Sequence, residues 1–445
     1  MLLPEHVLTC IRHLEDAGFA AYAVGGCVRD DMLGLRPGDY DLCTDALPEQ
    51  LRRIFSGFGL VLAGEKHGTV GVITPEGVVE ITTFRTEGGY EDHRHPKWVR
   101  FVPRIEEDLS RRDFTVNAMA WSPTRGLADP FGGQEDLRRR VLRTVGDPEA
   151  RFREDALRIL RGVRFAVRYQ LTPEPETMEA MIALAPSMDT LARERVFSEL
   201  CKLLPLISRE DILRYAPILF RVIPEMQEMA GFDQRTPHHA YDLLTHTAHV
   251  TAGVGKDLAL RWAALLHDTG KVSAFTLDQQ GQGHFYGHAA ISARVAEDIL
   301  RRLKAPNALR EEVVTLIGRH MAPLQPDKKL LRRAVNRMGI QTTKKLLALQ
   351  QADVIGTGIP HEADLQALDR VGQLLQELEA EDACFSLRQL AVNGNDIAAL
   401  GYAGRQIGQV LQLLLEQVLD EKTENRRSAL LTAAKNIHIP QEDTL

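Results

Sequence analysis

The sequence changes character once, at Gly146-Asp147-Pro148, and this change limits the folds that the chain can adopt. Before it, short β-rich runs alternate with helical segments. Nearly everything after it has the spacing of apolar residues that is typical of helices. We therefore expect an α/β or α+β head that ends near residue 146, followed by several all-α domains. At roughly 100 to 200 residues per domain, a chain of 445 residues corresponds to about three or four structural units.

Four β-rich runs and two helical segments can be placed within the head. The strands are expected at residues 21–24, 40–43, 69–74 and 78–84, and the helices at 27–33 and 48–55. Pro75-Glu76-Gly77 is a turn signal between the last two strands. The head should therefore contain a sheet with helices packed on it.

Composition excludes several classes of protein. Hydrophobic residues make up 44% of the chain and charged residues 26%, which predicts ordinary buried cores and argues against disorder. The five cysteines are scattered and contain no CxxC pair, so neither a disulfide framework nor a cysteine zinc site is expected. No apolar run is long enough to cross a bilayer, and the N-terminus has no basic leader. We expect a cytoplasmic protein without membrane contact.

The net charge of -7 counts against nucleic-acid binding by the surface as a whole, because phosphate contacts are made by Lys and Arg. Arginines nevertheless cluster near the end of the head. The two clusters comprise Arg138, Arg139, Arg140 and Arg143, and then Arg151, Arg153, Arg158, Arg161, Arg164 and Arg168. Each cluster is either a solvated helix face or a surface for phosphates.

Three acidic residues of the head are candidate metal ligands. Asp39 and Asp41 are two apart, so in a strand they would point to one side and repel each other without a cation. Carboxylate oxygens suit Mg²⁺. Glu80 lies in an otherwise apolar strand, where a charge is costly without a partner. Together they predict a two-metal site that activates a 3′-hydroxyl and stabilises pyrophosphate. The alternatives are a loop of turn-forming acids and an edge strand with Glu80 facing water.

A glycine pair, Gly25-Gly26, lies between the first expected strand and helix. It would let the backbone approach a phosphate closely at the start of that helix, or it is a plain turn.

These motifs resemble the catalytic signature of the tRNA nucleotidyltransferase and bacterial poly(A) polymerase family, class II of the polymerase-β-like superfamily. The resemblance covers essentially the whole chain. The matching segments are Gly25-Gly26-x-Val28-Arg29-Asp30, Asp39-x-Asp41, Arg111-Arg112-Asp113-Phe114-Thr115-Val116-Asn117-Ala118-Met119-Ala120 and Asp129-Pro130-Phe131-Gly132-Gly133. The resemblance implies a polymerase-β-like mixed sheet and a Mg²⁺-dependent transfer of AMP or CMP from ATP or CTP to the 3′ end of tRNA.

Further residues of this signature are candidates for nucleotide binding. We expect the triphosphate to be held by Gly25, Gly26, Arg29 and Arg112, the last through charge-assisted hydrogen bonds. Asp113 and Asn117 are four apart, at helical spacing, and could hold the ribose hydroxyls. The alternative is a helix N-cap at Asp113 followed by an amphipathic helix, and both roles can coexist.

Base selection is predicted for Asp155 and Arg158, which are three apart on an expected helix. Cytosine and adenine each present an amine donor beside a ring-nitrogen acceptor, which a carboxylate and a guanidinium can bind. Guanine and uracil mismatch both groups, at roughly 1–3 kcal/mol for each unpaired polar group. In the family, the matching Glu-Asp-x-x-Arg motif has this role. Arg161 and Arg164 continue the same face. The alternative is an intrahelical salt bridge.

By the same resemblance, a helix with Glu194-Arg195-Val196 and Glu199 supports this pocket. Family members that add the terminal A carry a flexible loop after the strand of the third carboxylate. Residues 83–96 resemble an intact version, with Gly88-Gly89 and the charges of Arg85, Asp92 and Arg94. We therefore favour full CCA addition over CC-only or A-only addition, with a plain surface hairpin as the alternative. The absence of a long basic tail argues against a poly(A) polymerase.

A second metal site is predicted in the helical part. The order His246, His267-Asp268, Asp353 resembles the HD phosphohydrolase superfamily, and His288 and His320 could extend the site. Imidazole and carboxylate ligands suit transition metals as well as Mg²⁺, so Mg, Mn, Ni and Fe are candidates. The segment would be a phosphohydrolase acting on phosphorylated or cyclic ends, or a purely structural domain.

The resemblance divides the chain into five expected domains: a nucleotidyltransferase head at 1–146, a helical neck at 147–205, a body at 206–235, an HD-type domain at 236–375 and a body and tail at 376–445. The tail is expected to contact tRNA by shape and phosphates. The expected partners are tRNA, CTP and ATP, with no obligate protein partner. The rivals from other classes are an HD phosphohydrolase with a nucleotide-binding head and a noncatalytic RNA-binding scaffold.

Overall fold

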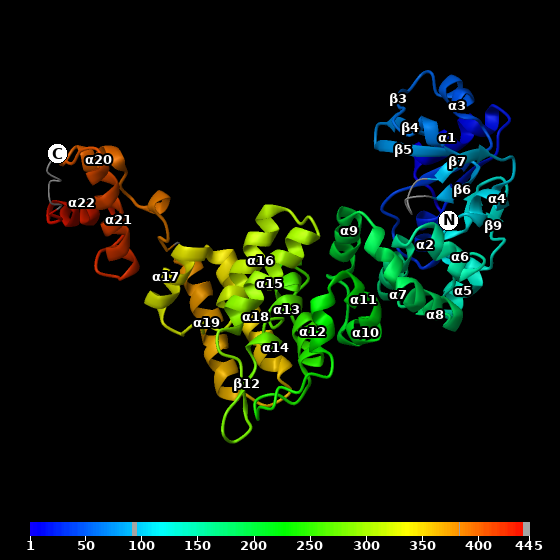
Figure 1. Cartoon of the computed structure of the whole chain (residues 1–445). Helices are drawn as coiled ribbons and strands as arrows, with labels where there is room; N and C mark the ends of the chain where they lie inside the picture. The colour runs from blue at the N-terminus through cyan, green and yellow to red at the C-terminus, as the bar shows by residue number, and fades with distance from the viewer. Residues whose placement is uncertain (91–95, 382, 439–445) are drawn as a thin grey trace. The chain divides into compact units, whose positions relative to one another are not determined.

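The computed structural model describes residues 1–90, 96–381 and 383–438. Its internal contacts divide the chain into two compact units, Met1–Gln227 and Glu228–Leu445. Figure 1 shows that strands are concentrated in the N-terminal part of unit 1 and that helices dominate the remainder. The predicted change from a mixed to a helical fold near residue 146 is confirmed.

A mixed sheet forms the centre of the head. Its strands run in the order β3-β4-β5-β2-β1-β8-β9. The strands β2 and β5 pair in parallel, and the other neighbours pair antiparallel. Their bounds are β1 (Ala21–Val24), β2 (Asp41–Thr44), β3 (Gly59–Val61), β4 (Thr69–Thr74), β5 (Gly77–Thr83), β8 (Ala120–Ser122) and β9 (Gly126–Ala128). All four strands predicted from the sequence are present, with small shifts of their ends.

The alternation of side chains along β5 fixes which face it buries. Val79, Ile81 and Thr83 are buried, whereas Val78 and Glu80 are exposed on the other face. Because β5 lies between β4 and β2, it is an interior strand, so the alternative of an edge strand is wrong, whereas its expectation that Glu80 faces water is confirmed. Helices α1 (Glu5–Asp16), α2 (Gly26–Met32) and α3 (Pro48–Ile54) pack against this sheet, and β6 (Arg85–Tyr90) and β7 (Pro96–Phe101) form a separate hairpin.

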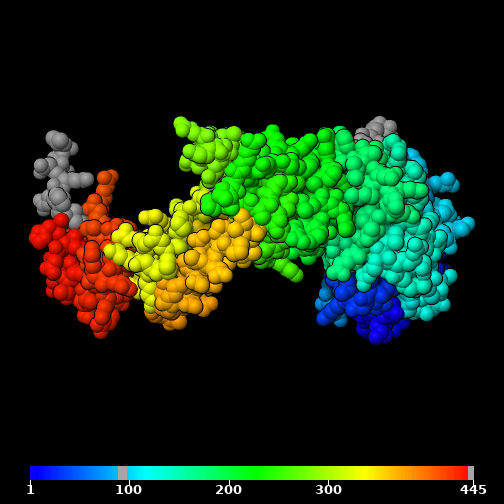
Figure 2. Space-filling model, turned by 90° about the horizontal axis from the view of Figure 1, so that it is seen from below, coloured from blue at the N-terminus to red at the C-terminus, as the bar shows by residue number. Residues whose placement is uncertain are grey.

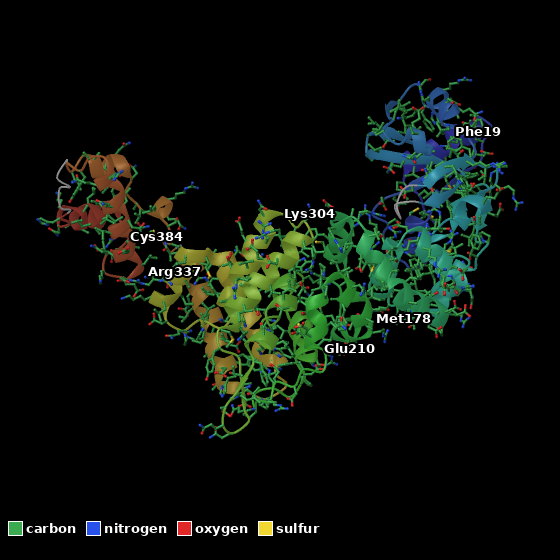
Figure 3. The ribbon with its side chains drawn as sticks, in the orientation of Figure 1. Phe19, Met178, Glu210, Lys304, Arg337 and Cys384 are labelled. Carbon is green, nitrogen blue, oxygen red and sulfur yellow. The ribbon has the colours of Figure 1, made fainter. Side chains whose placement is uncertain are left out.

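Helices complete unit 1. Asp147 caps α6, since its side chain accepts from the backbone N–H of Ala150, and Pro148 occupies the first turn, where no N–H is needed. The helices of this part are α6 (Pro148–Glu154), α7 (Leu157–Tyr169), α8 (Pro175–Leu184), α9 (Arg193–Leu203), α10 (Arg209–Arg214) and α11 (Ala216–Val222). Figure 3 labels Met178 on α8 and Glu210 on α10.

Unit 2 begins with a helical assembly in which Asp242 caps α12 and Asp257 caps α13. Its larger helices are α12 (Leu243–Gly253), α13 (Leu258–Leu266), α15 (His288–Arg302), α16 (Asn307–Arg319), α17 (Lys328–Met338), α18 (Ile340–Gly356) and α19 (Glu362–Ala380). The C-terminal helices α20 (Gly394–Ala398), α21 (Arg405–Leu419) and α22 (Arg427–Lys435) enclose a small apolar core of their own and are orange to red in Figure 2. None of the described helices combines the length and apolar character needed to cross a membrane.

Candidate active site

Three carboxylates line an open pocket of the head. Asp39, Asp41 and Glu80 all line it, and all three are exposed. Only Asp41 lies in β2, whereas Asp39 belongs to the loop before it, so the expectation that both are strand residues is wrong. The acids nevertheless approach one another because β2 and β5 pair in parallel, with Leu42 opposite Ile81.

The electrostatics of this pocket favour a cation. The pKa of Asp41 is raised, first by partial desolvation of its carboxylate and then by the negative charges of Asp39 and Glu80, while Arg112 opposes the shift. Like charges at short range disfavour ionisation of one another unless a counter-charge is present. The oxygen-rich ligand set and the mutual repulsion therefore fit a divalent metal ion.

Gly25 and Arg112 form the adjacent edge of the site. Gly25 has φ of 75°, a region that L side chains rarely adopt, and a Cβ there would lie 2.8 Å from Nη1 of Arg112. Arg112 is anchored at 3.4 Å by the fully buried Asp108, yet its buried Nε has no hydrogen-bond partner among the described residues. A buried donor without a partner is costly, which favours an anion as its partner.

Arg29 lies behind this edge, where it joins the head to α7. It is 5% exposed, forms an ion pair of 2.7 Å with Asp30, and donates to Asn117 and to the hydroxyl of Tyr169. Its guanidinium carbon also lies 4.1 Å from the centroid of the Tyr169 ring. The predicted contact of Arg29 with a triphosphate stays a prediction, because the guanidinium is occupied by these partners.

Asp113 and Asn117 are brought together as predicted, but by a different local structure. The segment contains only a single 3-10 turn at Thr115–Asn117, so the predicted amphipathic helix is wrong. Asn117 donates to Asp113 across 3.0 Å, and Arg161 of α7 donates to the other carboxylate oxygen at 2.6 and 2.9 Å. Burial opposes ionisation of Asp113, but Arg161 and Asn117 outweigh it and hold its pKa well below the usual range.

Asp155 and Arg158 lie at a break between two helices. The helix α6 ends at Glu154 and α7 begins at Leu157, with Asp155 in extended conformation between them, so the prediction that both residues lie on one helix is wrong. Their side chains also pair with other residues. Asp155 accepts from Arg195 at 2.8 Å, and Arg158 donates to Glu154 at 2.7 Å. The alternative of a salt bridge between Asp155 and Arg158 is therefore wrong for the described structure.

The helix α9 supports this region, as the family resemblance implied. Arg195 of α9 holds Asp155, and Glu199 of α9 accepts from Arg164 of α7 at 2.6 Å. Glu199 and Arg164 are both buried. Sequence reasoning missed Glu154 and Arg195 as direct partners of the proposed base-selecting pair. Glu154 and Arg158 are four residues apart, and this helical spacing was the signal that could have predicted their ion pair.

The hairpin of β6 and β7 contacts the same region through Glu87. Arg111 lies 3.4 Å from Glu87 and 3.0 Å from Asp108, which connects the hairpin to the segment of Arg112. Two charges predicted to act in this loop, Asp92 and Arg94, lie outside the described residues.

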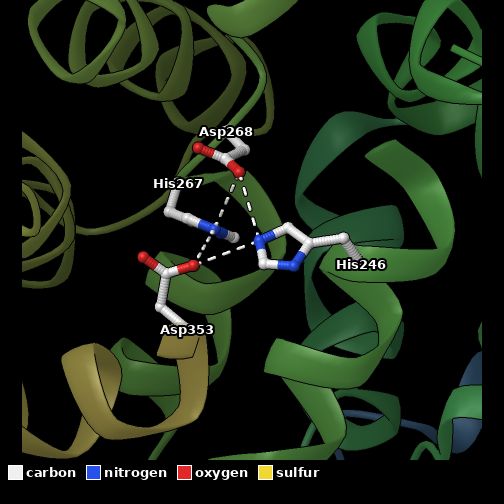
Figure 4. A group of neighbouring side chains, drawn as sticks. All are labelled: His246, His267, Asp268 and Asp353. Carbon is white, nitrogen blue, oxygen red and sulfur yellow. Dashed lines mark ion pairs between the residues drawn. The ribbon is translucent and has the colours of Figure 1, made fainter. Parts of the chain in front are cut away.

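A second cluster lies in unit 2, where His246 of α12, His267 and Asp268 after α13, and Asp353 of α18 converge (Figure 4). His246 Nε2 is 3.3 Å from Asp268 Oδ2 and 3.1 Å from Asp353 Oδ1. His267 Nε2 is 3.1 and 3.5 Å from the same two atoms. The four predicted residues are therefore brought together.

The atoms of this cluster point at a common centre. Nε2 of His246, Nε2 of His267 and both oxygens of Asp268 are buried and make no hydrogen bond, although they lie at ion-pair distance. Nδ1 of His267 faces the carbonyl of Ala264 at 2.8 Å, so it must donate, which directs the Nε2 lone pair to the centre. Four ligand atoms in this arrangement suit a divalent metal ion.

Protons and a metal ion would compete for this cluster. Burial opposes protonation of His267, but Asp268 and Asp353 outweigh it and raise its pKa to about 10. Burial likewise opposes ionisation of Asp268, yet His267, Lys271 and His246 hold its pKa well below the usual range. The cluster therefore has the charge distribution of a site that exchanges protons for a cation.

Comparisons with known proteins agree with this arrangement of sites. Family models match a poly A polymerase head domain at residues 21–143, a probable RNA and SrmB-binding site of polymerase A at 170–206, and an HD domain at 243–356. The CCA-adding enzyme of Bacillus velezensis is 33% identical, over 94% of this chain and 95% of its own length. That of Geobacillus thermodenitrificans is 31% identical, over 96% and 95%.

The chain belongs to the CCA-adding enzyme family. A solved member of this family, the Bacillus stearothermophilus CCA-adding enzyme in complex with CTP, is 29% identical and aligns with a TM-score of 0.68, covering 97% of each chain. The Thermotoga maritima CCA-adding enzyme complexed with tRNA aligns with a TM-score of 0.57 at 20% identity and agrees in fold. The family assignment expected from the sequence motifs is thus confirmed, as is the mixed sheet followed by helical domains.

Membership of the CCA-adding enzyme family makes the chain a nucleotidyltransferase that processes tRNA. The head and HD matches both indicate use of divalent metals, and the two ligand clusters lie within or beside the matched segments.

Proposed function

We propose that the chain adds and repairs the 3′-terminal CCA of tRNA without a template, using CTP and ATP and releasing pyrophosphate. The observation that carries the proposal is that Asp39, Asp41 and Glu80 line one pocket in a chain of this family. A relative that is 29% identical over nearly its full length was solved with CTP, which supports CTP as a substrate. We propose tRNA, CTP and ATP as the partners, and no obligate protein partner.

The proposed chemistry uses Mg²⁺ held by the three carboxylates, Asp39 and Asp41 first and Glu80 as the third ligand. Bound there, the cations would favour ionisation of the tRNA 3′-hydroxyl and neutralise charge on the leaving pyrophosphate. The 3′-oxygen forms a bond to the α-phosphorus, the bond from that phosphorus to the pyrophosphate oxygen breaks, and the hydroxyl proton is lost. Arg112 binds the triphosphate through its unpartnered Nε, and Gly25-Gly26 allows close approach of the backbone.

Base selection is proposed for Asp155 and Arg158. Asp155 would accept from the exocyclic amine of cytosine or adenine, and Arg158 would donate to the ring nitrogen. Both groups are paired in the described structure. A bound base must therefore displace Arg195 from Asp155 and Glu154 from Arg158, or bind alongside them. Arg195 and Glu154 are therefore proposed as positioning residues. When no base is present, they keep the side chains of Asp155 and Arg158 in place and pair with their charges.

The remaining candidates form the wall behind the nucleotide. We propose that Asp113 and Asn117 face the ribose. We also propose that Arg29, Arg161 and Arg164 complete the nucleotide-binding region, because they bind Asn117, Asp113 and Glu199, respectively.

The proposed domains keep the bounds 1–146, 147–205, 206–235, 236–375 and 376–445, with the last contacting tRNA. Cytoplasmic tRNA is the proposed substrate.

The proposal is tested by incubating the purified full chain with tRNA lacking its last three nucleotides, with each nucleoside triphosphate alone and with CTP and ATP together. Sequencing of the product ends should show two C residues with CTP alone and complete CCA ends with both. Runs of A with ATP alone would indicate a poly(A) polymerase. Only C addition, or only A addition to CC ends, would indicate a partial activity. Binding of tRNA without incorporation would indicate a noncatalytic scaffold.

A second candidate function is hydrolysis of phosphorylated or cyclic ribose ends in unit 2. The observation that favours it is a pocket of about 660 Å³ that opens beside the ligand cluster and is lined by Lys271, His288, Asp353 and His361. Mg, Mn, Ni and Fe remain the candidate metals. Opening of the ring of a nucleoside 2′,3′-cyclic phosphate, or release of phosphate from a 3′-phosphate, should vanish in His246→Ala and persist in Asp41→Ala. The opposite pattern would contradict this assignment.

A further inference from the structure

Arg161, Phe165 and Tyr169 follow one another at intervals of four residues and share one face of α7. Tyr169 is the last residue of this helix and is 4% exposed. Its backbone carbonyl accepts from Arg140 at 3.0 Å. Its ring stacks on that of Phe165, with centroids 6.1 Å apart and an angle of 28° between the planes. The end of α7 therefore holds the Tyr169 side chain in place.

The Tyr169 hydroxyl helps to fix the orientation of Arg29. Nη2 of Arg29 donates to this hydroxyl, and Nε and Nη2 donate to Asp30 at 2.9 and 2.7 Å. The guanidinium carbon also lies 4.1 Å from the centroid of the Tyr169 ring. Because the guanidinium is planar and buried, contacts at two of its nitrogens determine where the third, Nη1, points.

Arg29 and Asp113 together permit only one orientation of the Asn117 amide. Nη1 of Arg29 donates to Oδ1 of Asn117, and Nδ2 of Asn117 donates to Asp113 Oδ1 at 3.0 Å. The lowered pKa of Asp113 keeps its carboxylate ionised, so it only accepts, and a guanidinium only donates. A flipped amide would therefore oppose donor to donor and acceptor to acceptor. The second N–H of Asn117 is thereby held in a fixed direction.

These contacts close into a ring that joins α7 to the head. Arg161 donates to Asp113 Oδ2 at 2.6 and 2.9 Å, and its guanidinium carbon lies 5.2 Å from the centroid of the Phe165 ring. All members except Arg161 are buried, so water cannot readily replace a lost contact. In order around the ring, the members are Tyr169, Arg29, Asn117, Asp113, Arg161 and Phe165.

We propose that Tyr169 is a positioning residue through which the head selects ribonucleotides over deoxyribonucleotides. Its hydroxyl holds Arg29, Arg29 holds the amide of Asn117, and the second N–H of that amide donates to the 2′-oxygen of the bound nucleotide. Tyr169 acts through these two residues and not on the nucleotide directly. The inference rests on the proposed function at one point, the assignment of Asp113 and Asn117 to the ribose.

Removal of the hydroxyl separates this role from simple packing. Tyr169→Phe keeps the stacked ring but takes one acceptor from Arg29. A buried donor without an acceptor is unfavourable, so the guanidinium should turn toward other acceptors and release the Asn117 amide. CTP should then lose a contact to its sugar, whereas dCTP has no 2′-hydroxyl and no such contact to lose. If Tyr169 only packed α7 against the head, binding of both nucleotides would weaken equally.

The test measures equilibrium binding of CTP and of dCTP to the full chain by calorimetry, with Mg²⁺ and without tRNA, so that no nucleotide is transferred. The parent should bind CTP about 10-fold more tightly than dCTP, since one net hydrogen bond is lost with the 2′-hydroxyl. Tyr169→Phe should weaken CTP binding by about 3- to 10-fold and leave dCTP binding unchanged.

The matched control is Tyr215→Phe, because Tyr215 is also buried in unit 1 but lies outside the ring, and it should bind both nucleotides as the parent does. Three results would overturn the proposal: equal weakening of both nucleotides in Tyr169→Phe, no change of either, or a parent without preference for CTP.

A cycle of two substitutions tests whether Tyr169 acts through Asn117. In an Asn117→Ala background, Tyr169→Phe should weaken CTP binding no further, because the amide that it positions is absent. The same loss in both backgrounds would overturn the proposal. Nucleotide addition to truncated tRNA is measured separately. A parent that prefers CTP over dCTP but adds no nucleotide would reject the proposed function and leave the role of Tyr169 standing.

Discussion

The head and unit 2 each gather metal-ligand residues, but they do so with opposite electrostatics. The head brings together three exposed carboxylates, and the pKa of Asp41 is raised by desolvation and by like charge. Unit 2 buries histidines against carboxylates, so that the pKa of His267 is raised and that of Asp268 is lowered. An exposed set of like charges suits cations that arrive and leave with a triphosphate. A buried set of mixed charges suits cations that stay bound.

Removing one carboxylate from the head should abolish nucleotide addition without affecting unit 2, and this is the largest expected effect. Asp41→Ala should lower nucleotide addition by at least about 10³-fold, since several kcal/mol of charge stabilisation is lost, while the metal content of unit 2 is unchanged. Steady-state assays with truncated tRNA measure the effect. Glu76→Ala is the matched control, because Glu76 lines the same pocket without belonging to the carboxylate group. Equal losses in both variants would contradict the assignment.

Chelation should distinguish retained from exchangeable cations. A ligand present at about 100 times its dissociation constant stabilises the folded state by about 2.7 kcal/mol, so stripping metal should destabilise unit 2 by about that amount. Unit 1 should change little. Hydrogen exchange of the full chain, with and without prior removal of metal, resolves the two units. Equal loss of protection in both units would contradict the retention of cations by unit 2 alone.

Loss of base selection should be a smaller effect than loss of nucleotide addition. Asp155→Ala should reduce discrimination of CTP against UTP by about 10- to 100-fold, because one unsatisfied polar group is worth roughly 1–3 kcal/mol. Competition assays with both nucleotides measure the ratio. Asp189→Ala is the matched control, since Asp189 pairs with the exposed Arg221 away from this region. Unaltered selectivity in Asp155→Ala would reject the role of this carboxylate.

Asp113→Asn should lower the stability of unit 1 by about 2 kcal/mol, because Arg161 loses its partner but is partly exposed. The native pKa of Asp113 is lowered, so its contribution is present above the ordinary Asp value and is lost as pH falls through about 4 and below. Urea unfolding from pH 7 to pH 3 should therefore show the difference between variant and parent shrinking. A constant difference would contradict the ionic origin.

The parts predicted well from sequence are those with a short-range signal. The strands of the head follow from their β-rich runs and turns, and the meeting of His246, His267, Asp268 and Asp353 follows from a recognisable order of ligands. The motif order also identified the family. These features depend on residue type and spacing, which the sequence displays directly.

The errors arose where local spacing was read as regular structure. Asp155 lies at a break between helices, although its segment has helical spacing. Its carboxylate accepts from the backbone N–H of Leu157 at the start of α7 and also pairs with Arg195 of α9. Asp113 and Asn117 meet through a single 3-10 turn that Arg161 completes from α7. The ion pairs with Arg195 and with Arg161 join residues 40 and 48 positions apart, which no local pattern reveals.

The contrast between the two sites rests on cations gathering at the head only with the nucleotide. A crystal of the full chain soaked with Mn²⁺, with and without a nonhydrolysable CTP analogue, tests this by anomalous scattering at the manganese edge. We predict density among Asp39, Asp41 and Glu80 that requires the nucleotide, and density around Asp268 in both crystals. Nucleotide-bound crystals with no density among the three head carboxylates would contradict the account.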